Sequence, residues 1–484
     1  MKILFSHSYF LRFDPKQWAA GQPYAPLGTL YAAALMRKKG YDIALFDTMF
    51  IRDPNEVTNK IEAYTPDLFI IYDDGFNYLT KMCLTNMRDA AFKMIQIAKE
   101  RGCTVIVSSS DSTDYYEQYL DSGADFILLG EAELTLSELA DTLQKKEADF
   151  TSIQGIAFRQ NNNLIKTPRR NVIHDLDDLP MPAWDLVDIG VYRQYWLKSS
   201  GYFSMNIGTT RGCPFRCNWC AKPIYGNRYN SRSPDNVVTE LKFLKEKYNF
   251  DHIWFCDDIF GLKPAWINEF ARLVTDENLK FSFKIQSRAD LLLQEDNIKA
   301  LARAGCANVW IGAESGSQQI LDAMDKGITT EQIKTATLLL KKNDIKPSFF
   351  IQFGYPGETK EDIHKTIAMI NKLLPYSIGI SVSYPLPGTI FYEKVKADLD
   401  KKANWTDSDE LKLMFRNTYQ PAFYKQLHRY TQKNHRMHLS YEYVKRAIKN
   451  PAFLSLIALR KVASLFYYVP AVFLAKLKLN ALEK

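Results

Sequence analysis

One segment carries most of the information in this sequence: Thr210-Arg-Gly-Cys213-Pro-Phe-Arg-Cys217-Asn-Trp-Cys220. Its three cysteines have the spacing C-x3-C-x2-C. They follow directly after Ser204–Thr209, a candidate strand at the start of a strand–helix alternation. The thiols are therefore expected on a loop at the end of a strand, where they can act together as metal ligands.

Two kinds of metal site suit three clustered cysteines. Three thiolates can bind three irons of a 4Fe–4S cubane, which leaves the fourth iron open for an exchangeable ligand. The alternative is structural zinc, which usually takes four ligands. The nearest downstream histidine, His252, is about thirty residues away, so the spacing favours the cluster at Cys213, Cys217 and Cys220.

Strand and helix patterns alternate around this motif. Ser233 before Pro234, and Thr359 three residues before Asp362, are typical helix starts. The predicted strands are Ser204–Thr209, Ile253–Cys256, Phe281–Gln286, Asn308–Gly312, Ser348–Phe353 and Ile378–Ser383. Six βα units predict a partial (βα)6 TIM-type barrel over residues 201–390, with functional residues at the C-terminal ends of its strands.

Residues 1–145 show the same alternation. The predicted strands are Ile3–Ser6, Ile43–Phe46, Leu68–Tyr72, Val105–Val107 and Phe126–Leu129, and the predicted helices are Leu30–Lys39, Met82–Lys99, Tyr115–Asp121 and Glu133–Gln144. Short apolar runs between helices predict an α/β domain with a doubly wound parallel sheet. Residues 146–200 read as a hairpin and linker, and residues 391–484 as a helical, basic C-terminal region.

Composition narrows the class of protein. The chain has seven cysteines, and the four outside the motif are isolated: Cys83, Cys103, Cys256 and Cys306. This pattern favours a reducing compartment over a disulfide framework, and the start of the chain shows no signal peptide, so we expect a cytoplasmic protein.

The net charge of +7 comes from the tail, because residues 425–484 carry +10 and the rest −3. Bulk charge therefore gives no reason to expect nucleic-acid binding.

The cysteine motif resembles the signature of the radical S-adenosylmethionine (SAM) superfamily, C-x3-C-x-aromatic-C, with Trp219 at the aromatic position. The resemblance covers about residues 200–390. It implies that SAM chelates the open iron of the cluster. Reductive cleavage of SAM then yields a 5′-deoxyadenosyl radical that takes a hydrogen atom from the substrate. The electron would come from a donor such as flavodoxin or ferredoxin.

The resemblance also implies SAM contacts at the ends of successive strands. These are Trp219, Asp257, Asp258, Ser287, Arg288, Glu314 and Gln352. Asp257-Asp258 stands where the family more often has Gly-Gly-Glu, so either carboxylate could bind the amino group of SAM. Arg288 suits the methionine carboxylate because its fork binds carboxylates bidentately. The simpler alternatives are a turn or cap at the Asp pair and a helix-capping role for Glu314.

The N-terminal segment resembles the cobalamin-binding domain fused to one subgroup of radical SAM proteins. The expected cobalamin contacts are Pro26, Leu27, Gly28, Ser108, Ser109, Gly130 and Glu131. Two features depart from the pattern. No Asp-x-His-x-x-Gly is present, since His7 does not fit it, and Ser108-Ser109-Ser110 replaces a Gly-Gly pair. The alternative is a structural domain that only covers the barrel mouth.

These resemblances imply a cobalamin-dependent radical SAM methyltransferase acting on an unreactive carbon of a small-molecule or lipid-like substrate. The first alternative is a non-methylating oxidative cyclase, of the anaerobic magnesium-protoporphyrin monomethyl ester type, or a rearrangement enzyme. The second is a non-catalytic iron–sulfur protein for electron transfer. No general base is named, because radical chemistry need not use one.

The tail contains an uncharged run, Val462–Ala475, between Arg460-Lys461 and Lys476. Fourteen residues are too few to span about 30 Å of hydrocarbon as a helix. Basic flanks around such a run are typical of an interfacial anchor, so residues 460–478 are a candidate for peripheral membrane contact. The alternative is a last helix packed on the barrel.

Overall fold

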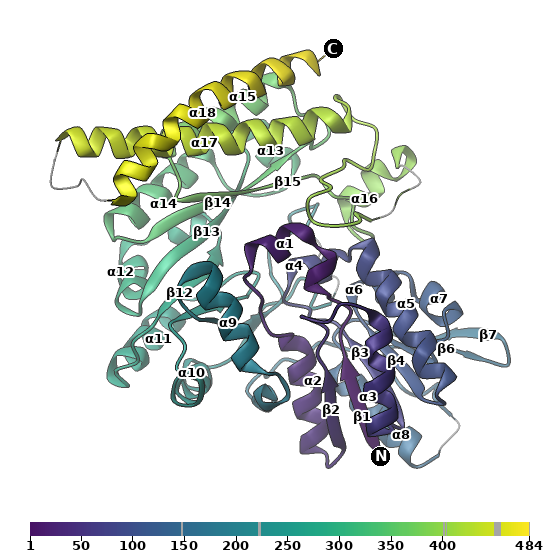
Figure 1. Cartoon of the computed structure of the whole chain (residues 1–484). Helices are drawn as coiled ribbons and strands as arrows, with labels where there is room; N and C mark the ends of the chain where they lie inside the picture. The colour runs from purple at the N-terminus through teal and green to yellow at the C-terminus, as the bar shows by residue number, and fades with distance from the viewer. Residues whose placement is uncertain (147–148, 221–223, 400–401, 403, 450–455, 484) are drawn as a thin grey trace.

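Two sheets, one of them parallel throughout and the other mostly parallel, lie next to each other, and a long helical hairpin lies along the outer edge of the second (Figure 1). The computed structural model describes every residue except 147–148, 221–223, 400–401, 403, 450–455 and 484. Central strands of the first sheet, such as Leu68–Tyr72, are fully buried, as expected for strands covered on two faces. Strands of the second sheet, such as Ser282–Ser287, instead alternate buried and half-buried residues.

The N-terminal sheet has the strand order β2-β1-β3-β4-β5-β6-β7. Its strands are β1 Lys2–Ser6, β2 Asp42–Phe46, β3 Leu68–Tyr72, β4 Thr104–Ser108, β5 Phe126–Leu128, β6 Ile156–Gln160 and β7 Asn163–Lys166. Strands β1 to β5 pair in parallel, which confirms the predicted doubly wound sheet. The predicted hairpin is present, and β6 adds antiparallel to β5, so the sheet continues past residue 145.

The helices of this domain are α1 Pro15–Ala20, α2 Leu27–Lys38, α3 Val57–Tyr64, α4 Tyr78–Met82, α5 Thr85–Glu100, α6 Ser110–Asp114, α7 Tyr116–Asp121 and α8 Glu133–Gln144, with short 3-10 turns at Leu11–Phe13 and Pro54–Glu56. The single helix predicted from Met82 is wrong at its start: Cys83 has φ 46°, which ends α4 before α5 begins. Helix α6 was not predicted, and it begins because Ser109 caps it.

The second sheet is a half-barrel with the order β15-β14-β13-β12-β11-β8, parallel throughout, as predicted. Its strands are β8 Ser204–Ile207, β11 His252–Phe255, β12 Ser282–Ser287, β13 Cys306–Glu314, β14 Lys346–Phe353 and β15 Ser377–Val382. A separate two-stranded ribbon pairs β9 Thr210–Arg211 with β10 Asn230–Ser231.

The helices that cover the half-barrel are α10 Pro234–Tyr248, α11 Pro264–Asp276, α12 Glu295–Arg303, α13 Gln318–Ala323, α14 Thr330–Lys342 and α15 Lys360–Leu373, with a 3-10 turn at Asp290–Leu292. Ser233 caps α10, and Thr359 forms a capping box with Asp362 at the start of α15. Both predicted helix starts are therefore confirmed.

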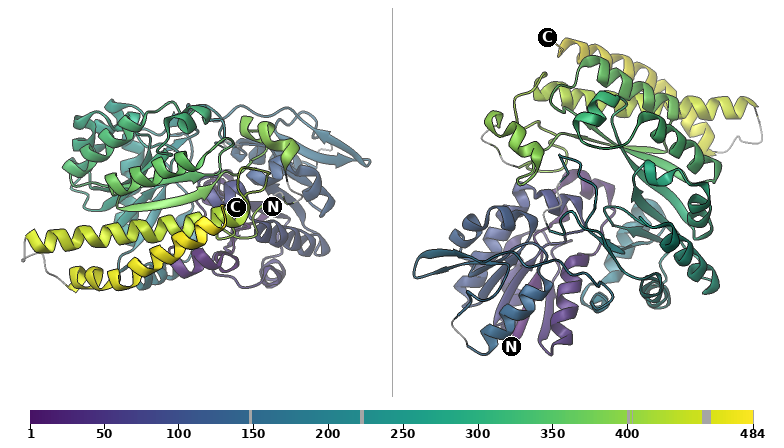
Figure 2. Two further views of the ribbon diagram at one scale, coloured as in Figure 1. Left: turned by 90° about the horizontal axis from the view of Figure 1, so that it is seen from above. Right: turned by 180° about the vertical axis from the view of Figure 1, so that it is seen from behind.

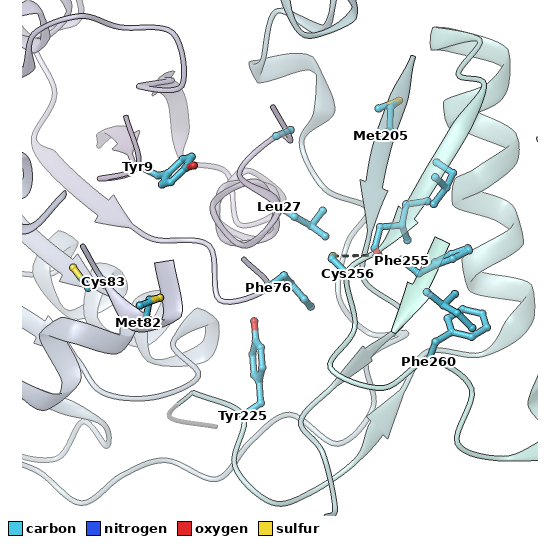
Figure 3. Packing of buried hydrophobic residues seen from close by; sticks show 14 of the residues in the cluster. Tyr9, Leu27, Phe76, Met82, Cys83, Met205, Tyr225, Phe255, Cys256 and Phe260 are labelled. Carbon is cyan, nitrogen blue, oxygen red and sulfur yellow. Dashed lines mark hydrogen bonds between the residues drawn. The ribbon is translucent and has the colours of Figure 1, made fainter. Parts of the chain in front are cut away.

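The linker between the sheets contains a helix that was not predicted, α9 Ile189–Ser200, after a 3-10 turn at Trp184–Leu186. Two buried indoles attach this linker to both domains. Trp184 Nε1 donates to Glu240 of the second domain at 3.0 Å, and Trp196 Nε1 donates to the Pro23 carbonyl of the first at 2.6 Å. One hydrophobic cluster continues through both domains. Figure 3 shows Leu27 and Phe76 of the first domain pointing toward Cys256 and Tyr225 of the second.

The C-terminal region begins with α16 Ile390–Val395 and a 3-10 turn at Lys396–Asp398. It ends in an antiparallel pair of long helices, α17 Pro421–Lys449 and α18 Leu456–Ala481, that lies along the outer edge of the half-barrel (Figure 2). Asn404 ties the segment before this pair to the first domain, because its amide donates to the carbonyls of Met82 and Cys83 at 3.0 and 2.9 Å. The predicted helical tail is confirmed.

Candidate active site

The three cysteines lie on a loop whose two ends are joined by the β9–β10 ribbon. Cys213 is buried two residues after β9, and Cys217 and Cys220 are half-buried. Gly212 has φ 79°, and a Cβ there would collide with the Arg228 carbonyl, so only glycine fits this close approach. The ribbon therefore closes the loop and presents all three thiols at the C-terminal end of β8.

Cationic side chains surround these thiols. Arg288 Nη1 lies 3.7 Å from Cys217 Sγ, and the guanidinium also stacks 3.7 Å from the centre of the Phe215 ring. Burial alone would lower the pKa of Lys326, but the charges of Glu314 and Cys217 raise it overall. The pKa of Lys81 is raised in the same way, against burial, by Asp258 and then Cys220. Such surroundings stabilise thiolates, the form that binds iron.

The donor set fits an iron–sulfur cubane. Among the residues that the structure describes, no three His, Cys, Asp or Glu side chains gather closely enough to hold one metal ion. A cubane binds each thiolate on a different iron, so its protein ligands lie farther apart than those of a single ion. Within the same described residues, Trp219 Nε1 is buried without a hydrogen-bond partner, which leaves an unsatisfied donor beside the thiols.

Asp257 and Asp258 have different surroundings. Asp257 is fully buried and accepts from the Thr209 and Thr210 amides at 2.6 and 2.9 Å and from the Thr209 hydroxyl at 2.5 Å. Burial raises its pKa to about 7. Asp258 instead faces the first domain, where Lys81 Nζ lies 2.6 Å from its Oδ1. Asp257 therefore anchors the start of the cysteine loop, and Asp258 is the carboxylate at the domain interface.

Ser287 and Arg288 lie where predicted, at the end of β12, and both are buried. The Arg288 fork is held by Asp290, with N–O distances of 3.0 and 3.2 Å, and by the Gly327 carbonyl at 3.4 Å. These contacts orient the guanidinium toward Cys217. The predicted role of Arg288 in holding a carboxylate remains a prediction.

Glu314 and Gln352 end the next two strands. Glu314 is buried, has φ 56° and accepts from Lys326 Nζ at 2.8 Å. Its carboxylate is thus engaged by Lys326, while Ser317 occupies the N-cap position of α13. Gln352 donates to the Ser383 hydroxyl at 2.9 Å. All the predicted SAM-binding positions, from Asp257 to Gln352, therefore lie at C-terminal strand ends on the side of the cysteine loop.

Two residues of the first domain also reach this site, and the sequence reasoning missed both. Lys81 approaches Asp258, as described above. Tyr78 is 47% exposed, yet its pKa is raised by burial and then by the charges of Cys220 and Glu314. The charges of Cys220 and Glu314 thus act on Tyr78 from across the domain boundary. No local motif signals these residues, because they approach only when the domains pack.

The residues expected to bind cobalamin lie at the C-terminal edge of the first sheet. Pro26 is the N-cap of α2 and Leu27 is fully buried. The Gly28 amide donates to Asp74 at 3.2 Å. Ser108 ends β4, and its backbone carbonyl accepts from the backbone amide of Asp73 at 2.8 Å, while the side-chain hydroxyl of Ser109 caps α6. These contacts show how the edge is built without assigning a ligand to it.

Two observations at this edge fit a bound polar ligand. Ser110 Oγ is buried and has no hydrogen-bond partner among the described residues. Gly130 has φ 82°, and a Cβ there would have only the Ile224 carbonyl nearby, at 3.7 Å. A buried hydroxyl without a partner is costly unless something binds it, and a bare glycine permits close approach to the backbone.

Glu131 joins this edge to the cysteine loop. Its Oε1 lies 2.5 Å from Arg211 Nη1, and Glu133 Oε1 lies 2.7 Å from Arg211 Nη2. The second oxygen of Glu131 accepts from the Ile173 amide at 2.5 Å. All three charged side chains are buried. Arg211 comes two residues before Cys213, so these contacts attach the cysteine loop to the first domain.

A half-barrel with three thiols after its first strand, joined to a doubly wound sheet, is the architecture of a cluster-binding SAM enzyme. Residues 207–370 match the Radical SAM superfamily, and the chain is a radical SAM enzyme.

The chain is 29% identical, over 388 residues, to an uncharacterized methyltransferase of Pyrococcus horikoshii, covering 78% of this chain and 80% of that one. It is 26% identical to an anaerobic magnesium-protoporphyrin IX monomethyl ester cyclase of Synechocystis, covering 66% of this chain and 62% of that one. The fold is similar to that of TsrM, a radical SAM methyltransferase of Kitasatospora setae solved with cobalamin and a [4Fe–4S] cluster. The TM-score is 0.68 at 18% identity, covering 82% of this chain and 75% of that one.

Proposed function

We propose that this enzyme is a cobalamin-dependent methyltransferase that adds a methyl group to an unreactive carbon of a small-molecule or lipid-like substrate. The observation that carries the proposal is the buried contact of Arg211 with Glu131 and Glu133. It joins the cysteine loop to the edge of the first sheet that is expected to bind cobalamin. Methyl transfer needs both cofactors to reach one pocket, and this contact holds their two expected sites together.

Each part of the site has a task in this proposal. When bound, the cluster and SAM supply a 5′-deoxyadenosyl radical, and cobalamin supplies the methyl group. Cys213, Cys217 and Cys220 would hold three irons. Arg288 and Lys326 place positive charge beside Cys217. The first domain covers the strand ends and excludes water from a reactive radical.

Most of the residues proposed to bind SAM lie at the C-terminal ends of successive strands. SAM would bind at Trp219, Asp258, Ser287, Arg288, Glu314 and Gln352. Asp257 would not contact SAM directly; it would hold the start of the cysteine loop through its hydrogen bonds with Thr209 and Thr210. Cobalamin would bind over Gly28, Ser108, Ser109 and Gly130, with the Ser110 hydroxyl free to contact it. A flavodoxin or ferredoxin would supply the electron.

A radical cyclase is the second candidate, favoured by the similarity to the magnesium-protoporphyrin ester cyclase. It would use the same cluster and SAM positions but would not transfer a methyl group. The two reactions differ in product mass, because methylation adds a methyl group whereas oxidative cyclisation removes hydrogens.

The test is SAM cleavage by anaerobically purified protein that has been reconstituted with iron and sulfide. Wild type and Cys217→Ala are reduced in the presence of SAM, with and without methylcobalamin. We expect 5′-deoxyadenosine from wild type only, and S-adenosylhomocysteine only when cobalamin is present. Deoxyadenosine without S-adenosylhomocysteine under every condition would favour the cyclase. No deoxyadenosine from cluster-loaded protein, even with candidate substrates, would favour the electron-transfer alternative.

A further inference from the structure

Helix α18 has one face packed on α17 and one face turned outward. The packed face includes Val472, Ala475 and Leu479, which are buried. Two polar contacts fix the pair: Gln426 Nε2 donates to the Ala475 carbonyl at 2.8 Å, and the hydroxyls of Ser440 and Ser464 lie 3.0 Å apart. Figure 2 shows α18 lying along α17 on the outside of the molecule. The helix is therefore held flat against its own domain.

The outward face of α18 is apolar along its length. Its exposed apolar residues recur at helical spacings of three, four and seven, so they form one stripe. They are Leu459, Phe466, Tyr467, Phe473, Leu474 and Leu477. Phe466 is 86% exposed and Phe473 is 62% exposed. Single exposed apolar side chains are ordinary, but a contiguous stripe with aromatic members marks a surface that is covered by something else.

Basic residues border this stripe. Arg460 and Lys461 lie at one end, and Lys476 and Lys478 lie at the other, all exposed. The sequence from 443 to 482 contains no aspartate or glutamate. An apolar stripe with a basic border matches the lipid chains and headgroups of an anionic membrane surface.

We propose that the outer face of α18 docks on an anionic lipid bilayer, with the helix lying in the plane of the interface. Phe466 and Phe473 enter the boundary between headgroups and chains, and the four basic side chains contact anionic headgroups. Tyr467 suits this depth because its ring is apolar and its hydroxyl is polar.

The helix lies on the membrane and does not cross it. By length and composition alone, Leu459–Ala481 could span a bilayer. However, the uncharged run Val462–Ala475 has fourteen residues, which is about 21 Å of helix against a hydrocarbon thickness of about 30 Å. Its other face also remains packed on α17, which carries many charged residues. A flat position satisfies both constraints.

A second copy of this chain fits the same face less well. A symmetric dimer through α18 brings two basic borders together, and like charges across an interface oppose association. Anionic lipid complements those charges. The lipid surface is therefore the occupant that both the apolar stripe and its border favour.

The test is flotation of the full-length, cluster-loaded enzyme with vesicles. One set contains phosphatidylcholine alone, and the other contains phosphatidylcholine with phosphatidylglycerol. We expect the protein to float with the anionic vesicles and to be released by high salt. The variant Phe466→Ser/Phe473→Ser should lose at least about tenfold in binding, because each buried aromatic side chain contributes strongly to transfer. Lys476→Glu/Lys478→Glu should lose the preference for anionic lipid.

Leu338→Ser is the matched control, since Leu338 is also more than half exposed but lies on α14. It should bind vesicles like wild type. Iron content and SAM cleavage of all variants should be unchanged, which separates this inference from the proposed chemistry. The inference is overturned if wild type fails to float with anionic vesicles. It is also overturned if sedimentation shows a dimer that Phe466→Ser/Phe473→Ser dissociates, while vesicle binding is equal in all variants.

Discussion

Arg211 Nη1 and Glu131 Oε1 lie 2.5 Å apart across the boundary between the two sheets. Arg211 begins the cysteine loop from β9, and Glu131 follows β5 of the first domain. Burial lowers the pKa of Arg211, but the charges of Glu133, Tyr225 and Glu131 raise it well above its ordinary value. Buried ion pairs of Arg211 thus attach the loop that is expected to hold the cluster to the N-terminal domain.

Arg211→Gln should destabilise the protein and reduce its iron content. The substitution leaves the carboxylates of Glu131 and Glu133 buried without their partner, which typically costs about 3–5 kcal/mol. Chemical denaturation and iron analysis measure the two effects. Arg272→Gln is the control, because Arg272 forms surface ion pairs on α11, and it should change neither.

The triple variant Arg211→Met/Glu131→Gln/Glu133→Gln separates charge from packing. Because it removes all three charges together, it should recover part of the stability lost in Arg211→Gln. A triple variant as unstable as the single one would show that the shape of the arginine, and not its charge, holds the loop.

Arg288→Leu should lower the reduction potential of the cluster. A cation 3.7 Å from Cys217 Sγ stabilises the added electron, so its removal disfavours reduction. A tenfold change in the one-electron equilibrium corresponds to about 59 mV. Redox titration followed by electron paramagnetic resonance, without SAM, measures the shift. Arg288→Lys keeps the charge and should shift the potential less, and equal potentials in Arg288→Leu and wild type at full iron loading would refute the prediction.

Glu358 should make stability depend on pH. Burial raises its pKa from 4.5 to about 8. Its Oε2 accepts from the Gly354 amide at 2.6 Å, while Oε1 is buried without a partner among the described residues. Because the folded state holds this proton more tightly than the unfolded state, stability falls as pH rises from about 4.5 to 8. The contribution is of the order of a few kcal/mol.

Glu358→Gln removes this titration and keeps a hydrogen-bonding side chain of the same shape. The free energy of unfolding of the variant should therefore vary less with pH between 5 and 8 than that of wild type, measured by urea denaturation at a series of pH values. Its advantage over wild type should grow toward pH 8. Parallel pH profiles for the two proteins would contradict the shift.

Asp257→Asn and Asp258→Asn should have different effects. Asp257 uses its oxygens on the Thr209 and Thr210 donors, so its substitution should lower thermal stability and iron loading. Asp258→Asn should keep iron loading and lower thermal stability less, because an amide oxygen can still accept from Lys81, but it should weaken SAM binding about tenfold, which is typical for loss of a charge-assisted hydrogen bond. Equilibrium dialysis with SAM and melting curves distinguish the two. Equal loss of SAM binding with normal melting in both variants would assign SAM contact to both carboxylates.

The sequence determined most of the strands and the chemistry of the cysteine loop. Strand positions, the half-barrel and the capped starts of α10 and α15 follow from patterns within a few residues. Local geometry governs such features, because periodicity, caps and ligand spacing act over one or two turns of chain. The same holds for the cysteine motif, whose three ligands lie within eight residues.

Only the tertiary structure determined which charged side chains form ion pairs. Arg211 and Glu131 are 80 positions apart, and Lys81 and Asp258 are 177 apart, so no local pattern connects them. Their pairing depends on how two sheets pack, which is a property of the whole apolar core. The same packing buries one face of α18 and leaves Phe466 exposed. Hydrophobicity along the chain shows that such a helix is apolar, but which of its faces is covered is settled only by the neighbours that the fold places against it.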